Sequence, residues 1–302
     1  MPDGKPVDNI RYGTSSWTDK TLLDCKCFYP PDVDTPAERL RYYSERFPLV
    51  EVDSSYYALP SERNAALWIE RTPIDFVFDV KAFSLLTHHP APARGLPAKL
   101  REELPDKKRF YRKDLPPEAL QLVEDMFVSA LRPLDAAGRL GMVLFQFPHW
   151  FVPSRANRDY LEQLADSFPY RIAVEFRGGG WVKDDESAER TLALLQELAF
   201  TYVVVDEPQG FKTSVPPVVA ATSPELAIVR FHGRNAETWD KPGISPAERF
   251  RYLYTEEELR EWVEPVKELA AKSKQVHVLM NNCYEDYGVR NAAQIADLIA
   301  SR

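Results

Sequence analysis

Residues 172–181 read Ile-Ala-Val-Glu-Phe-Arg-Gly-Gly-Gly-Trp, a stretch that begins like a buried β-strand and ends in three glycines and a tryptophan. Successive side chains of a strand point to opposite faces, so Glu175 and Arg177 share one face while the other face is entirely apolar. In a closed barrel, an apolar face packs on the surrounding helices and the opposite face points into the lumen. The stretch therefore predicts a barrel strand whose inward face carries charge.

Eight runs rich in Val, Ile, Phe and Tyr predict strands at residues 10–15, 49–54, 75–81, 141–147, 171–177, 201–206, 226–232 and 275–281. Stretches of helical periodicity lie at 36–47, 61–72, 116–137, 154–168, 185–199, 255–272 and 287–301. Residues 207–225 contain too many prolines for a normal helix, which predicts an irregular sixth crossover. Alternation of strands and helices predicts a parallel sheet, and eight strands predict a single (β/α)8, TIM-barrel-like domain over residues 1–302. A doubly wound open sheet is the alternative, which the absence of GxGxxG after the first strand disfavours.

Length and charge exclude several classes of protein. The chain has 302 residues and a net charge of -8, so an overall basic footprint for nucleic acid is absent. No apolar run approaches the roughly 18 residues that a membrane span requires. The first ten residues are polar and lack the apolar centre of a signal peptide. We therefore expect a cytoplasmic protein with no membrane partner.

The same alternation assigns polar side chains of the other strands to the lumen. The expected inward set is Glu51, Asp53, Asp79, Lys81, Gln146, Glu175, Arg177, Asp206, Arg230 and His232. The last strand has an ambiguous register, with Asn281 or Asn282 at its inward end. Because active sites of this fold lie at the carboxyl ends of the strands, the members at that rim form the expected site.

The acid–base properties and charges of these side chains predict their roles. Glu175 or Asp53 would serve as general base and His232 as acid or base, because imidazole titrates near neutral pH. Lys81, Arg177 and Arg230 would bind and stabilise anionic charge. The remaining expected contacts to substrate are the rim aromatics Trp17, Tyr56 and Trp181 together with His88, Gln146, Asp206, Asn281 and Asn282.

The loop after the third strand is long, rich in proline and basic. Residues 89–115 hold eight Lys or Arg residues and four Asp or Glu residues, so 8 − 4 gives +4 in a chain of net charge -8. Long loops on the top face of a barrel are often lids, and positive potential concentrates anions. We expect this loop to be an inserted basic loop or lid over a small anionic ligand, with nucleic acid as an alternative partner.

The sequence leaves the cofactor unknown. No nucleotide-cofactor motif is present. A divalent metal would use His88, His232, Asp53, Glu175 and Asp206, but the chain has only five histidines and no HxH or HExxH spacing. A metal site is therefore the less favoured alternative.

Short motifs occur in order along nearly the whole chain: GTSSW (13–17), FYP (28–30), VEVDSSYYALP (50–60), W…TP…F.F..K (68–81), LTH (86–88), FQFP (145–148), VEFR…W (174–181), VRFHG (229–233) and MNN…NA (280–292). In this order they resemble the DUF72 family, also called YecE-like. The resemblance implies a TIM-barrel-like fold and brings no assigned function. Two positions depart from the family's pattern, because Ser16 stands where members often have Gly and Asp53 where they often have Asn.

Two functions of different class remain open. The first is a hydrolase or lyase that acts on an anionic substrate, phosphate- or sugar-containing, at the carboxyl rim of the barrel. The second is a non-catalytic binding protein for a nucleotide, a nucleic acid or an anionic metabolite. The convergent charges favour the first, and the lack of a recognisable catalytic triad keeps the second.

Overall fold

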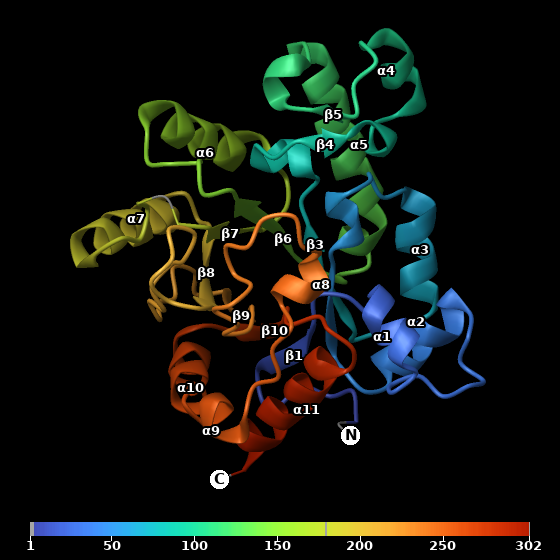
Figure 1. Cartoon of the computed structure of the whole chain (residues 1–302), viewed down its shortest axis with the longest axis vertical. Coiled ribbons are helices and arrows are strands. Elements are labelled where there is room, and N and C mark those ends of the chain that lie inside the picture. The colour runs from blue at the N-terminus through green and yellow to red at the C-terminus, as the bar shows by residue number, and fades with distance from the viewer. Residues whose placement is uncertain (1–2, 179, 302) are drawn as a thin grey trace.

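The computed structural model describes residues 3–178 and 180–301 and contains a closed barrel of eight parallel strands (Figure 1). The strands are β1 (Ile10–Thr14), β2 (Leu49–Val52), β3 (Val77–Lys81), β6 (Leu140–Phe147), β7 (Ile172–Phe176), β8 (Thr201–Asp206), β9 (Leu226–Phe231) and β10 (Gln275–Met280). Around the barrel they follow the order β1-β10-β9-β8-β7-β6-β3-β2. All eight predicted strands are present, and the predicted TIM-barrel-like fold is confirmed.

Helices surround the barrel, and the longer ones lie within the predicted ranges. The main ones are α2 (Pro36–Ser44), α3 (Glu62–Glu70), α5 (Pro117–Ala136), α6 (Arg155–Ser167), α7 (Asp185–Glu197), α10 (Val263–Lys272) and α11 (Tyr287–Ala300). Shorter helices are α1 (Lys20–Cys25), α4 (Ala98–Glu103), α8 (Pro246–Arg249) and α9 (Glu256–Arg260). At the start of α2, Thr35 and Glu38 form a reciprocal capping box, which satisfies amide groups that the first turn leaves free.

One predicted helix is interrupted. Residues 255–272 form α9 and α10 rather than one continuous helix, with the break at Glu261 and Trp262. The indole of Trp262 turns back toward the barrel, where it packs on Phe231 and donates to Asp206 at 2.7 Å. This inward contact explains why the helix does not run through.

The crossover between β8 and β9 contains no helix, as its prolines predicted.

The basic segment 89–115 contains regular secondary structure and is not a simple loop. It forms a two-stranded antiparallel sheet of β4 (Ala91–Pro92) and β5 (Arg109–Phe110) with α4 between them. Figure 1 shows this unit at one end of the molecule, next to α5.

Register fixes which side chains point inward, because residues paired across parallel strands face the same side. Gln146 pairs with Glu175, and Glu51 pairs with Asp79. The opposite parity is apolar and buried, as at Val50, Phe78 and Val174. The interior therefore carries the polar and charged side chains that alternation predicted in β2, β3, β6, β7 and β9.

No helix in the described part of the chain is long and apolar enough to cross a membrane.

Candidate active site

A fully buried arginine, Arg230 of β9, joins three strands across the lumen. Its Nε and Nη2 donate to the two carboxylate oxygens of Glu51 at 2.9 and 2.8 Å. Its Nη1 donates to Glu175 Oε2 on β7, and Nη2 also reaches Ser15 Oγ at 3.3 Å. Such fork-shaped pairing holds both carboxylates in fixed positions. Four of the five N–H groups of Arg230 therefore donate to described residues of the barrel interior.

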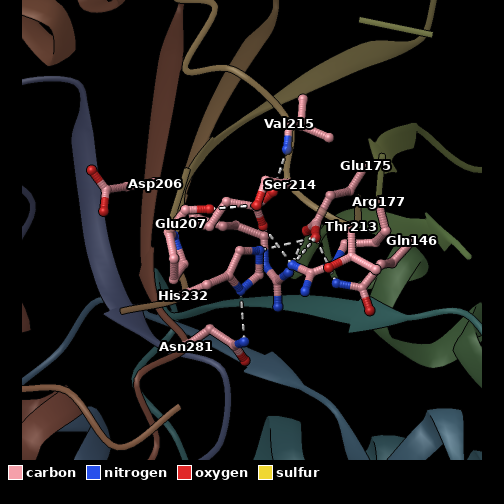
Figure 2. Close-up of polar contacts among 12 residues, drawn as sticks. Gln146, Glu175, Arg177, Asp206, Glu207, Thr213, Ser214, Val215, His232 and Asn281 are labelled. Atoms are coloured by element: carbon pink, nitrogen blue, oxygen red, sulfur yellow. Dashed lines mark hydrogen bonds and ion pairs between the residues drawn. The ribbon is translucent and has the colours of Figure 1, made fainter. Parts of the chain in front are cut away.

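Glu175 sits at the centre of this arrangement. Its Oε1 accepts from Gln146 Nε2 at 2.6 Å and from His232 Nε2 at 2.9 Å, as Figure 2 shows. Burial opposes ionisation, but Arg230, His232 and Arg177 outweigh it and hold the pKa of Glu175 well below its usual range. The carboxylate is therefore ionised and saturated with donors. We call Glu51, Glu175, Arg230 and His232 the floor network.

The imidazole of His232 is held on both sides. Asn281 Nδ2 donates to His232 Nδ1 at 2.8 Å, while Nε2–H donates to Glu175 (Figure 2). Burial lowers the pKa of His232 to about 4, against the opposing attraction of Glu175, so the ring is neutral at pH 7. Neither Glu175 nor His232 lines the cavity above them. Their catalytic roles stay predictions, and their geometry is that of a rigid support.

Above the floor network lies a cavity of about 340 Å³, which we call the mouth cavity. It opens at the carboxyl ends of the strands, where this fold places its active sites. Its walls are Asp19, Asp53, Tyr56, Tyr57, Lys81, Gln146, Arg177, Ile244, Pro246, Ala247, Arg249, Phe250, Asn281 and Cys283. Six of the predicted site residues meet here, namely Asp53, Tyr56, Lys81, Gln146, Arg177 and Asn281.

Lys81 and Asp53 stand out because each lacks a partner. No carboxylate of the described residues lies within 4.0 Å of Lys81 Nζ, which instead lies 4.8 Å from the centre of the Tyr56 ring. Burial and the charge of Arg230 lower the pKa of Lys81. No other described side chain donates a hydrogen bond to Asp53, and burial raises its pKa to about 6, although Lys81 opposes the shift.

Arg177 is the third charged group of the wall, and an acid that sequence reasoning missed holds it there. Arg177 Nη1 donates to Glu207 Oε2 at 2.8 Å and lies 3.6 Å from Glu175 Oε1. Its guanidinium stacks 4.5 Å from the Trp239 ring centre. Its other N–H groups donate to no described residue, and the side chain lines the mouth cavity. Arg177 is therefore anchored on one edge and free to bind an anion on the other.

Glu207 is buried directly after β8. Its Oε1 accepts from the Val215 amide at 2.6 Å, and burial raises its pKa to about 7 against the attraction of Arg177 (Figure 2). The only sequence signal for this residue is the acid pair Asp206-Glu207 at the end of the strand. Side-chain alternation in the sequence assigned Asp206 to the lumen, whereas in the structure Glu207 is the acid that pairs with Arg177.

The register of β8 corrects the prediction for Asp206. Val205 pairs with the inward Arg230, and Asp206 pairs with the outward Phe231. Asp206 accordingly accepts from Tyr254 OH at 2.6 Å and Arg234 Nη2 at 2.7 Å in the outer layer, and Figure 2 shows it apart from the floor network. It borders a separate hollow of about 320 Å³, where it is already paired with Arg234. Asp206 is thus outside the mouth cavity.

Two more predicted contacts face the helices instead of the cavity. His88 has a left-handed backbone conformation and packs against Phe151 and Tyr160, with ring centres 5.0 and 4.6 Å away. Trp181 is buried, stacks on Phe176 at 4.7 Å and donates its indole N–H to the Phe151 carbonyl. Both side chains take part in one aromatic cluster, whose apolar surface outweighs their chain position beside the rim.

Asn282 and Trp17 also lie outside the mouth cavity. Asn282 is buried and donates to Asn291 Oδ1 at 2.8 Å and to the Tyr252 carbonyl. Trp17 packs edge-on against Trp68, with ring centres 6.1 Å apart. The ambiguity in the last strand is thereby resolved in favour of Asn281.

The basic segment 89–115 contributes no wall of the mouth cavity. Its apolar side chains, including Leu96, Leu100 and Phe110, are buried, and Arg112 lies over Tyr160. The wall that closes the mouth comes instead from residues 244–250 of the β9–β10 connection, which include α8. The lining of the mouth cavity therefore does not support the prediction that the basic segment covers the site as a lid.

The five residues of the alternative metal site do not converge. His88 and Asp206 point to the outer layer, whereas Asp53 faces the cavity and Glu175 and His232 lie beneath it. Within residues 3–178 and 180–301, no group of three or more His, Cys, Asp and Glu side chains is arranged to hold a metal ion.

Comparisons with known proteins agree with this architecture. The family model described as "Protein of unknown function DUF72" matches residues 11–302. The chain is 33% identical over 297 residues to UPF0759 protein YunF of Bacillus subtilis (strain 168), a match that covers 96% of this chain and 94% of that protein. A DUF72 family structure from Thermotoga maritima MSB8 has 33% identity and a TM-score of 0.74, covering 96% of this chain and 98% of the other. A DUF72 family structure from Enterococcus faecalis V583 has 26% identity and a TM-score of 0.77, covering 97% and 96%.

Proposed function

The chain belongs to the DUF72 family, and we propose that its mouth cavity binds a small anionic substrate, phosphate- or sugar-containing, on which it acts as a hydrolase or lyase. The observation that carries this proposal is the meeting of Lys81, Arg177 and Arg249 around one cavity. Lys81 and Arg249 have no carboxylate partner among the described residues, and buried positive charge is costly unless something compensates it. An anion from solution supplies that compensation.

Asp53 supports a catalytic role for the same cavity. Its pKa of about 6 lets the carboxyl group take up and release a proton near neutral pH. Gln146 and Asn281 add amide groups at neighbouring strand ends, and Tyr56 and Tyr57 add aromatic surface. Together these groups can orient a polar, sugar-sized molecule. The general acid or base of the proposed reaction is therefore Asp53.

A non-catalytic binding role is the second candidate. The observation in its favour is that Glu175 and His232, the pair expected to carry chemistry, are fully occupied by internal hydrogen bonds. A barrel with a rigid floor and a cationic wall can hold an anionic metabolite without changing it. The two candidates differ in whether the bound molecule is converted to a product.

The test is incubation of the purified protein with a panel of sugar phosphates, followed by phosphorus NMR. Saturable binding and a new product signal would support the enzyme, and saturable binding with unchanged ligand would support the binding protein. We expect Arg177→Met to weaken affinity by about tenfold or more, since a hydrogen bond to a charged group contributes roughly 1.5–3 kcal/mol. Absence of binding for every member of the panel would contradict both.

Arg190→Met provides the matched control. Arg190 is an exposed arginine of α7 that pairs with Glu186 at 2.6 Å, so its loss removes one cation and one ion pair far from the mouth cavity. Equal loss of affinity in both variants would show that binding follows overall charge and not the cavity.

A further inference from the structure

The Lys81 side chain differs from every other cation of the site in having neither an acidic partner nor a hydrogen bond to a carbonyl group among the described residues. Arg230 is paired with Glu51 and Glu175, and Arg177 is paired with Glu207. Arg249 donates to the carbonyl groups of Thr238 and Lys241. Lys81 Nζ contacts the face of Tyr56 and lines the mouth cavity at the carboxyl end of β3. Its lone donor group therefore faces the space that a substrate would fill.

From this placement we infer that Lys81 is a catalytic nucleophile whose amine forms an iminium with the carbonyl carbon of the anionic substrate. The inference rests on the proposed function and narrows it to lyase chemistry. A lysine amine is nucleophilic only when unprotonated, and burial together with nearby cations favours that form. Lys81 meets both conditions, because its pKa is lowered by burial and by Arg230.

The wall around Lys81 indicates the class of substrate. Arg177 presents free guanidinium N–H groups to the same cavity, and these suit a carboxylate or phosphate. Lys81 requires an aldehyde or ketone. The substrate class is therefore a small anion that carries a carbonyl group, such as a 2-oxo acid or the open-chain form of a sugar phosphate.

Asp53 supplies the proton that the reaction needs. The unprotonated Nζ adds to the carbonyl carbon, and a proton moves from nitrogen to oxygen to give a carbinolamine. The C–O bond then breaks as Asp53 in its acid form protonates the departing hydroxyl, which leaves as water. The nitrogen lone pair forms the C=N bond, so the products are a protonated iminium, one water and the Asp53 carboxylate. The iminium can accept electrons from a neighbouring C–C or C–H bond, and water later restores the amine.

The experiment uses pyridoxal 5′-phosphate as a chemical probe, because it joins an aldehyde to a phosphate. The full-length protein is treated with the probe and then with sodium borohydride, whose hydride adds to the imine carbon and makes the bond permanent. Peptide mass spectrometry gives the labelled lysines. Lys274 is the internal control, since it is an exposed lysine that pairs with Glu225 just before β10, at the opposite end of the barrel.

We expect Lys81 to be labelled at least about tenfold faster than Lys274 at pH 7.5. The labelling rate should reach half its maximum at a pH below the ordinary lysine pKa of about 10.4. Excess inorganic phosphate should suppress it, and Asp53→Asn should slow it. Lys81→Arg should abolish the selective adduct, and circular dichroism checks that this variant is folded.

Labelling of Lys81 no faster than Lys274 would overturn the inference. If the protein then still bound the sugar phosphates through Arg177, the proposed function would stand without the iminium. If neither selective labelling nor anion binding were seen, both would fall. Selective labelling that phosphate does not suppress would also overturn the inference as stated, because the reactive amine would not share a site with an anion.

Discussion

In the floor network, Arg230 donates to Glu51 and Glu175, and His232 is held between Glu175 and Asn281. In the wall of the mouth cavity, Lys81 and Asp53 have neither an ion pair nor a hydrogen bond from another described side chain. Both regions are built on strands of one barrel and contain both acidic and basic residues. The difference lies in how completely each charge is compensated.

This contrast separates structural from chemical roles. A buried charge that is fully paired is stable in one geometry, and breaking the pair is costly. A charge without a partner is unfavourable in the folded protein and persists where a ligand can use it. Each of the following predictions tests whether the two regions differ in this way, beginning with the largest expected effect.

Arg230→Met should destabilise the protein most. It leaves the carboxylates of Glu51 and Glu175 buried without their main partner, which costs about 3–5 kcal/mol of unfolding free energy. Urea denaturation followed by circular dichroism measures this. Arg190→Met on the surface should change stability by less than about 0.5 kcal/mol. Similar values for the two variants would contradict a structural role for the floor network.

Glu175→Gln should have a smaller effect on stability. The amide keeps the shape of the side chain but loses the charge, so the hydrogen bonds from Arg230 and His232 weaken by roughly 1.5–3 kcal/mol in total. The folded variant should bind the sugar phosphates within about threefold of the original protein, because Glu175 does not line the mouth cavity. Loss of turnover with binding intact would instead give Glu175 the catalytic role that its sequence position suggested.

Asp53→Asn should produce a stability change that depends on pH. The folded pKa of about 6 lies above the ordinary aspartate value of about 3.9, so the folded protein binds this proton more tightly than the unfolded chain. The cost of burying the charge is absent below about pH 4, grows between pH 4 and 6 and is complete above pH 6. The variant should be more stable by up to about 3 kcal/mol at pH 8 and close to the original at pH 4. A stability difference that does not change between those two pH values would contradict the assignment.

Lys81→Met should have the smallest effect on stability, within about 1 kcal/mol and with a gain expected at low ionic strength. Lys81 forms no direct ion pair, so its removal leaves no buried carboxylate without a partner. Removal of Arg230 leaves two. The same denaturation assay measures it. A loss as large as that of Arg230→Met would show that Lys81 belongs to the structural network.

The alternation of side chains in the sequence predicted much of this site. Charged residues between apolar ones in β2, β3, β7 and β9 could occupy only the inward face, because the outward face packs on helices. That rule correctly placed Glu51, Lys81, Glu175 and Arg230. It failed in β8, where Tyr202 through Val205 are apolar on both faces and carry no parity signal. Asp206 was therefore assigned to the lumen in place of Glu207.

Chain position beside the rim was a weaker guide than register. His88 and Trp181 follow barrel strands directly, yet both turn outward into an aromatic cluster with Phe151. Packing of large rings against one another decides such orientations, and it involves residues from several connections. The sequence also did not indicate which segment lines the mouth cavity, since residues 244–250 have no charge pattern that marks them as a wall.

The sequence by itself determined the number and order of the strands, the closed parallel barrel and the presence of charge in its lumen, because these follow from local periodicity. Only the tertiary structure decided which charges are compensated. Arg230 and Glu51 are 179 residues apart in the chain, and no local pattern connects them. The pairing of charges depends on distances of a few ångströms between distant segments, and those distances exist only once the barrel has closed.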